Sequence, residues 1–114
     1  MTAEPTDRIV RIRRELAALG LSQPEYWILR HLAPNDLGAD ASGRTLAELN
    51  AALGPYLLPG DDLAADAAAL LARALVARTP DARLHITPAG LAAHAGVKEN
   101  LPAIRTRLGE DGPA

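Results

Sequence analysis

The sequence predicts a single, mainly α-helical domain with one small β-hairpin. The chain has 114 residues, of which 48% are hydrophobic and 23% charged, ordinary values for one folded domain. Apolar residues recur at helical spacings of three and four, and only residues 75–87 alternate as strands do. We therefore expect one domain over 1–114, with an N-terminal helix at 6–19, a core at 21–90 and a C-terminal helix at 88–109.

The first two helices have clear boundaries. An apolar stripe on the first helix consists of Ile9, Ile12, Leu16 and Leu19, and Gly20 ends this helix. The segment Ser22-Gln23-Pro24-Glu25 is a capping box with proline in the first turn, so the second helix starts there. Its predicted inner face is formed by Ile28, Leu29 and Leu32.

Two further helices precede the hairpin. After a polar loop at 34–43, Thr45 and Glu48 form a second capping box that starts a short third helix, which Gly54 and Pro55 stop. A fourth helix is expected over 61–73, because acidic residues at 61 and 62 suit a helix N-terminus.

The hairpin and the last helix follow. Strands are expected at 75–78 and 83–87, joined by turn residues at 79–82. Thr87 and Pro88 open a fifth helix, which Pro102 should kink or split, and 109–114 should fray.

This order of elements is that of a winged helix-turn-helix flanked by N- and C-terminal helices. Four segments resemble motifs of the MarR family of bacterial transcription regulators. Residues 21–32 (LSQPEYWILRHL) are similar to its second-helix signature, and 71–78 (LARALVAR) to its transition into the wing. Residues 81–83 (DAR) and 84–90 (LHITPAG) resemble the wing motif and the exit from the wing.

The resemblance implies a homodimer that binds double-stranded DNA and often a small aromatic effector. Dimerisation would involve the apolar stripes of the terminal helices, namely Ile9, Ile12, Leu16, Leu101, Ile104 and Leu108; alternatively these stripes pack on the core of their own chain. The candidate DNA contacts are Arg44, Arg73, Arg78, Arg83 and His85. For Arg83 and His85, which share one strand face, the alternative is a solvent-facing side of the hairpin. The candidate effector pocket comprises Tyr26, Trp27 and Arg30, although large aromatic residues are more often core.

Several features depart from the family pattern. The fourth helix carries Asp61, Asp62 and Asp66 on or near the side expected to enter a groove, and across 44–87 five carboxylates stand against four arginines. The wing is short, and Ala74 replaces the usual glycine, so we expect a turn made without a left-handed residue or a slightly extended helix. Two functions stay open: a DNA-binding regulator, or a dimer that has lost DNA binding and serves as an interaction or scaffold module.

Other classes of protein are disfavoured. The chain has no cysteine, and its three histidines lie on separate predicted elements without the spacing of a helical metal site. A glycine-rich phosphate loop is absent, so we expect no enzyme, cofactor or metal. No apolar run reaches membrane-spanning length and no secretory signal is recognisable, which predicts a cytoplasmic protein.

Overall fold

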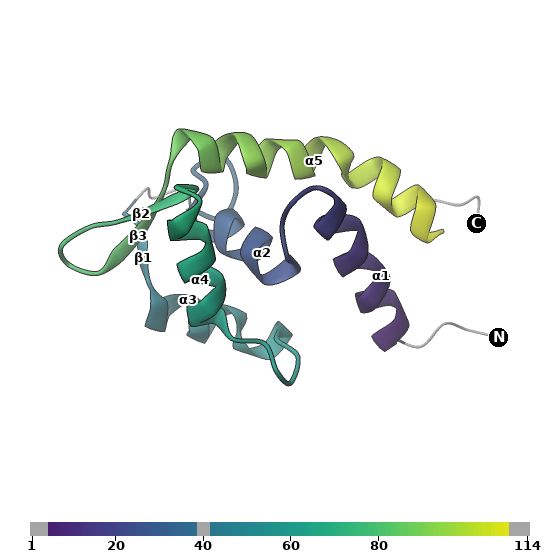
Figure 1. The fold of residues 1–114 in the computed structure, drawn as a ribbon, viewed down its shortest axis with the longest axis horizontal. Helices are drawn as coiled ribbons and strands as arrows, with labels where there is room; N and C mark the ends of the chain where they lie inside the picture. The colour runs from purple at the N-terminus through teal and green to yellow at the C-terminus, as the bar shows by residue number, and fades with distance from the viewer. Residues whose placement is uncertain (1–4, 39–41, 110–114) are drawn as a thin grey trace.

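The structure, a computed structural model, describes residues 5–38 and 42–109. The helices are α1 (Pro5–Ala18), α2 (Gln23–Leu32), α3 (Leu46–Leu53), a 3-10 turn η1 (Gly54–Tyr56), α4 (Leu63–Ala72) and α5 (Pro88–Leu108). The strands are β1 (Arg44–Thr45), β2 (Val76–Arg78) and β3 (Arg83–Ile86). Figure 1 shows α5 running along one side of the molecule, from the β2–β3 hairpin at one end to α1 at the other.

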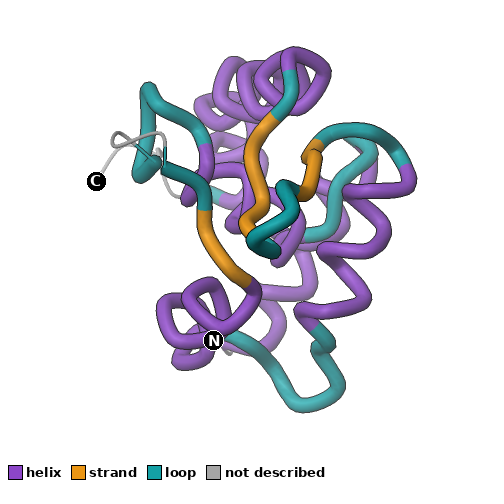
Figure 2. The backbone as a smooth tube through the Cα atoms, turned by 90° about the vertical axis from the view of Figure 1, so that its left-hand side faces the viewer, coloured by secondary structure: helices purple, strands orange, loops and turns teal. Residues whose placement is uncertain are grey.

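The predicted hairpin is part of a three-stranded antiparallel sheet with the order β1-β3-β2 (Figure 2). In the wing, Val76 lies opposite Ile86 and Arg78 opposite Leu84. The added strand β1 pairs Arg44 with Leu84 and Thr45 with Arg83. A strand of two residues is too short to show an alternation of polar and apolar residues, so the sequence could not reveal β1.

The predicted starts of α2, α3 and α5 are confirmed, whereas α4 begins at Leu63, two residues later than expected. In both capping boxes the hydroxyl accepts from the backbone N–H three residues on, and the glutamate accepts from the N-cap backbone N–H. The hydroxyl of Thr87 likewise accepts from the N–H of Gly90 and starts α5. Because these hydrogen bonds use donors that the first helical turn leaves free, each helix begins at a locally determined residue.

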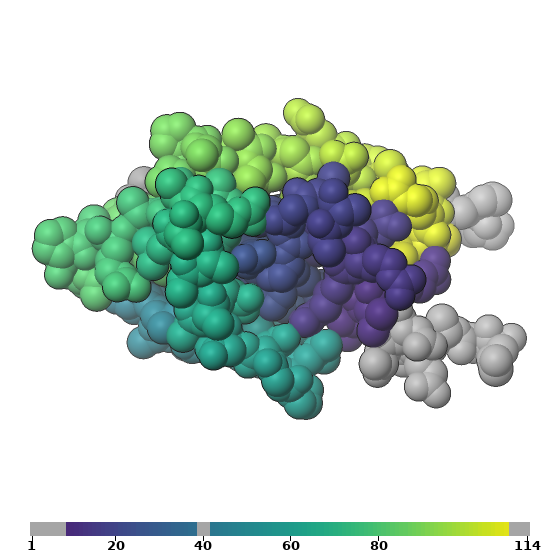
Figure 3. Space-filling view, in the orientation of Figure 1, coloured from purple at the N-terminus to yellow at the C-terminus, as the bar shows by residue number. Residues whose placement is uncertain are grey.

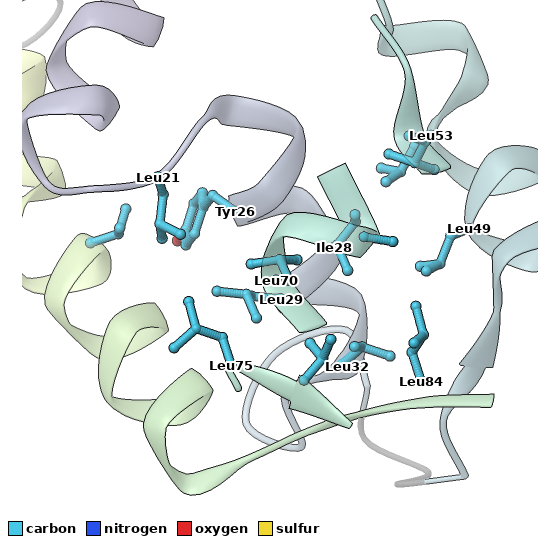
Figure 4. Close-up of a cluster of buried hydrophobic side chains, with 14 of the residues drawn as sticks. Leu21, Tyr26, Ile28, Leu29, Leu32, Leu49, Leu53, Leu70, Leu75 and Leu84 are labelled. Atoms are coloured by element: carbon cyan, nitrogen blue, oxygen red, sulfur yellow. The ribbon is translucent and has the colours of Figure 1, made fainter. Parts of the chain in front are cut away.

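The core joins α2, α3, α4 and the sheet (Figure 4). Ile28, Leu29 and Leu70 are fully shielded from solvent, as expected for the inner faces of α2 and α4. Leu84 projects from β3 into the same cluster, so the wing is anchored by its own apolar face. By contrast, Leu19 follows the end of α1 and is exposed, so it does not extend the apolar stripe of that helix.

One expectation about the backbone is narrowed and another is wrong. Of the kink or split expected at Pro102, the split does not occur: helix α5 continues through this residue, and in Figure 1 its C-terminal part inclines toward α1. The expectation for Ala74 is wrong. Ala74 adopts a left-handed φ of 58°, whereas the lack of a glycine at this position predicted a turn without a left-handed residue or a slightly extended helix. The N–H of Ala74 bonds the carbonyl of Leu71, and the N–H of Leu75 bonds that of Leu70, which is the Schellman pattern. These bonds hold the alanine in a strained conformation.

The expected fraying at 109–114 falls largely outside the described residues. Gly109 itself is ordered as the C-cap of α5, with φ 80° and an N–H bonded to the carbonyls of Arg105 and Thr106. Among the described helices, none is long and apolar enough to span a bilayer.

Candidate nucleic-acid interface and ligand cavity

Asp61, Asp62 and Asp66, at and just before the first turn of α4, do not form a continuous acidic face. Asp61 accepts two hydrogen bonds of 2.8 Å from the guanidinium of Arg13 on α1, and one of 2.7 Å from the N–H of Leu58. The bonds from Arg13 hold the pKa of Asp61 below its ordinary value, although burial opposes them. Asp62 is the N-cap of α4 and accepts from the N–H of Ala65. Two of these carboxylates therefore have structural partners.

Asp66 points toward the start of α2. Burial raises its pKa, and the nearby carboxylates of Glu25 and Asp61 raise it further, while a hydrogen bond with Ser22 acts in the opposite direction. The sequence interpretation that all three carboxylates lie on or near the groove side is thus wrong for Asp61 and Asp66. Helical spacing located them on one surface of α4, but it could not show that α1 and α2 cover part of that surface.

The outward side of α4 consists of alanines. Exposed positions on it are Ala64, Ala65, Ala68 and Ala72. In Figure 3 this helix is uncovered on the face toward the viewer. Base edges are read through hydrogen-bond donors and acceptors, which alanine lacks, whereas a methyl group can contact the methyl of thymine. Side chains in the middle of α4 therefore offer apolar contact only.

The predicted DNA contacts separate into three places. Arg78 is exposed at the end of β2, and its guanidinium has no hydrogen bond or ion pair within the part of the chain that the structure describes. Arg83 is half-buried and pairs with Glu48 at 3.3 Å and with Asp81 at 3.4 Å. Arg73, at the end of α4, donates to the carbonyl of Gly20 at 2.6 Å and so faces the α1–α2 turn. Of these three arginines, Arg78 has the greatest freedom to meet a phosphate.

Arg44 and His85 lie with Arg83 on the sheet. Arg44 donates to the carbonyl of Gly43 at 3.1 Å. His85 packs against Gly43 so closely that a Cβ there would be 2.7 Å from Nε2. Gly43 also has a left-handed φ of 76°, so glycine is required for two reasons. The structure thus brings Arg44, Arg83 and His85 together, and Arg78 lies across β3 from Arg44, because both are register partners of Leu84.

All three residues of the predicted effector pocket line one cavity. It has a volume of about 360 Å³ and lies between α1, α2 and α5. Tyr26, Trp27 and Arg30 contribute from α2, and Lys98 and Arg105 contribute from α5. Sequence reasoning missed these two cations, although 98, 101 and 105 recur at the spacing of one helix face. The cavity combines aromatic walls with positive charge.

Asp36 connects the elements around this cavity. Its carboxylate accepts from Arg30 Nε at 3.0 Å and lies 2.9 Å from Nε2 of His94 on α5. Burial opposes ionisation of Asp36, but the hydrogen bonds from Arg30 and His94 outweigh it and lower the pKa. His94 is fully buried, and its Nδ1 has no partner among the described residues.

The predicted dimer residues are partly used within one chain. Leu16 and Ile104 are each only 3% exposed. Ile9, Ile12, Leu101 and Leu108 are half-buried. Leu16 and Ile104 therefore pack within their own chain, which is the alternative to a dimer interface considered above. An interface with a second copy stays a prediction.

Comparison with known proteins agrees with this architecture. No model of a known family matches the chain, and no curated protein matches it. A solved structure does match: a MarR family protein of Mycobacterium tuberculosis in complex with DNA, with a TM-score of 0.64 and 22% identity. The match covers 88% of this chain and 71% of that one. The chain is therefore a winged helix-turn-helix protein. Its fold is of the MarR type, as the sequence motifs predicted.

Proposed function

We propose that this chain is a DNA-binding transcription regulator that recognises the duplex chiefly through its backbone and shape. The observation that carries the proposal is the likeness of fold to a MarR family protein solved in complex with DNA, over 88% of this chain. Phosphate contacts position such proteins, and base contacts specify the sequence. A regulator of this kind acts in the cytoplasm as a homodimer.

The wing and sheet would supply the cations. Arg78 has an exposed guanidinium, and Arg44 and Arg83 lie behind it on the sheet. Helix α4 would enter the major groove with its alanine side, where Ala68 and its neighbours can touch thymine methyl groups. Specificity would then depend on groove shape and on these methyl contacts.

The cavity between α1, α2 and α5 would hold the effector. Its aromatic walls suit a planar ring, and Lys98 and Arg105 suit a negative substituent. Because α1 and α5 also carry the predicted dimer stripes, a ligand there would lie between the head and the dimer helices.

The test is an anisotropy titration of a labelled duplex from the region upstream of the gene, at 50 and 200 mM salt. Binding should weaken with salt, because released counterions supply much of the affinity. Arg78→Ala should lower the affinity several-fold and reduce the salt slope by about one. Arg14→Ala removes an exposed arginine of α1 and is the matched control. Equal effects of the two variants would contradict the assignment to the wing.

A second candidate is an interaction module that no longer binds DNA. The alanine side of α4, together with five carboxylates against four arginines over 44–87, favours it. Absence of binding to any duplex at 50 mM salt would support this candidate and overturn the first.

A further inference from the structure

A hollow of about 370 Å³ lies between α3, α4 and the wing. These elements lie toward one end of the molecule, away from α1 (Figure 1). Most of the wall is apolar and is formed by Leu46, Ala47, Ala64, Ala67, Ala82 and Leu84. The only polar side chains that line it are those of Thr45 and Arg78. It shares no residue with the cavity between α1, α2 and α5.

The hollow borders the side of α4 that would enter the major groove. Ala64 is exposed on that side and also lines the hollow. Behind it, Ala67 is 4% exposed and Leu84 of β3 is 2% exposed, so the inner wall is nearly dry. A small apolar group on a base edge that meets Ala64 would therefore leave water and contact this wall.

Arg78 places a cation at the same hollow. It is the register partner of Leu84, so the two side chains emerge from the same face of the sheet. A phosphate held by Arg78 would keep one DNA strand against the hollow. In the major groove the C5 atom of a pyrimidine lies on the side of the base nearest its own backbone, so a methyl group on C5 is the part of the base that would arrive there.

The polar groups around α4 leave few other means of telling bases apart. The hydroxyl of Thr45 is the N-cap of α3 and accepts from a backbone N–H at 3.1 Å. Asp61 ahead of α4 bonds α1, and Arg73 at the end of α4 bonds the α1–α2 turn. Base recognition at this hollow would therefore depend chiefly on apolar contact.

Apolar contact distinguishes bases that hydrogen bonds cannot. Thymine differs from uracil, and 5-methylcytosine from cytosine, only by the C5-methyl group, and the donors and acceptors are the same within each pair. Burial of the methyl group removes apolar surface from water, so an apolar hollow favours the methylated base of each pair.

We propose that this hollow receives the C5-methyl group of a pyrimidine in the major groove. The chain then binds a duplex with thymine or 5-methylcytosine at that position more tightly than one with uracil or cytosine. The inference rests on the proposed DNA-binding function and extends it, because methylation of cytosine would strengthen binding without any change in sequence.

An anisotropy titration at 50 mM salt tests the proposal with the duplex from the region upstream of the gene. The duplex is made once with thymine and once with uracil at every A·T pair. The uracil form should bind at least about fourfold more weakly, the ratio expected for the burial of one methyl group. Equal affinity for the two forms would overturn this inference and leave the proposed function standing, whereas failure to bind either form would overturn both.

Single replacements extend the test to cytosine. Exchange of one thymine at a time for uracil identifies the position whose methyl group contributes affinity. A G·C pair is then placed at that position, with either cytosine or 5-methylcytosine. The methylated duplex should bind about fourfold more tightly, and equal binding of the two would contradict the proposal.

Variants assign the effect to this hollow. Ala64→Gln places a polar side chain at its exposed edge and should reduce the thymine-to-uracil affinity ratio to about one. Ala95→Gln makes the same change on the exposed side of α5 and should leave the ratio unchanged. Arg78→Ala should weaken both duplexes by the same factor, because a phosphate contact is insensitive to the base. Circular dichroism establishes that each variant is folded. A ratio that survives Ala64→Gln, or that Ala95→Gln lowers equally, would overturn the proposal.

Discussion

Helices α4 and α5 both border the wing, but they carry very different chemistry. The outward side of α4 presents alanines, among them Ala64 and Ala68. Helix α5 carries the buried His94 that meets Asp36 and the cations that line a cavity. Among the described residues, ion pairs join α1 and α5 to other elements, whereas the exposed side of α4 carries only alanines.

Under the proposed DNA-binding function, this difference bears on how the protein would recognise a duplex. Where a recognition helix lacks donors, affinity must come from the wing and the backbone contacts around it. The helix ends of α4 support that interpretation, because Asp61 binds Arg13 and Arg73 binds the carbonyl of Gly20. These polar groups set the position of α4 and are not available to a ligand.

The largest expected effect concerns the start of α5. A Cβ at Gly90 would lie 2.0 Å from the carbonyl oxygen of Leu75 and 2.7 Å from Ile86. Gly90→Ala should therefore lower the free energy of unfolding by about 3 kcal/mol or more. Gly96→Ala, on the same helix with no atom within 4 Å, should raise it by about 1 kcal/mol. Urea unfolding measures both, and a mild Gly90→Ala would show that α5 is not fixed against the wing.

Removing the charge of Asp61 and of Asp66, at the start of α4, should change the free energy of unfolding in opposite directions. Asp61→Asn loses a part-buried ion pair and should destabilise the fold by about 1–2 kcal/mol at pH 7. Asp66→Asn relieves repulsion from Glu25 and Asp61 and should stabilise it, by less than about 1 kcal/mol because solvent screens a half-buried group.

Acid should reduce both differences. The pKa of Asp61 is lowered in the folded state, so its contribution is present above about pH 4 and is lost as the pH falls through the lowered value. The pKa of Asp66 is raised, so its penalty is complete above that raised value and disappears as the pH falls from there to the ordinary value of about 4. Unfolding at pH 7 and pH 3 measures this, and effects of equal sign at pH 7 would refute the opposed environments.

The end of α4 should be improved by glycine. Ala74 has a left-handed φ of 58°, which costs an L-residue energy that glycine avoids. Ala74→Gly should stabilise the protein by about 0.5–1 kcal/mol, whereas Ala72→Gly, inside the helix, should destabilise it by a similar amount. Thermal unfolding of the pair decides the matter; destabilisation by both variants would show that Ala74 is not strained.

The smallest effect on stability is expected in the middle of α4. Ala68→Lys should change the free energy of unfolding by no more than about 0.5 kcal/mol, yet it should strengthen DNA binding several-fold by adding a phosphate contact. Ala95→Lys adds the same charge on the exposed side of α5 and is the control. Equal gains from both lysines would mean that α4 does not face the duplex.

Local signals in the sequence predicted the order of elements well. Capping residues such as Ser22, Thr45 and Thr87 act on their own helix, so their effect is visible without knowledge of the fold. What depends on contacts between distant segments was not visible: β1, the pairing of Arg13 with Asp61, and the burial of His94 beside Asp36. The candidate effector cavity was predicted from Tyr26, Trp27 and Arg30, but the two further cations that line it, Lys98 and Arg105, come from α5.

Helix α1 is fastened to two different parts of the molecule by Arg13 and Glu15, which both lie in its C-terminal half. Near its C-terminal end Arg13 holds Asp61 ahead of α4, and Glu15 receives Arg107 from the far end of α5 at 2.6 Å. Helix α1 therefore connects the segment ahead of α4 with the C-terminal end of α5. A tilt of α1 imposed from outside would be transmitted to the head and to the long helix together, so the two cannot be reoriented independently while both ion pairs remain closed.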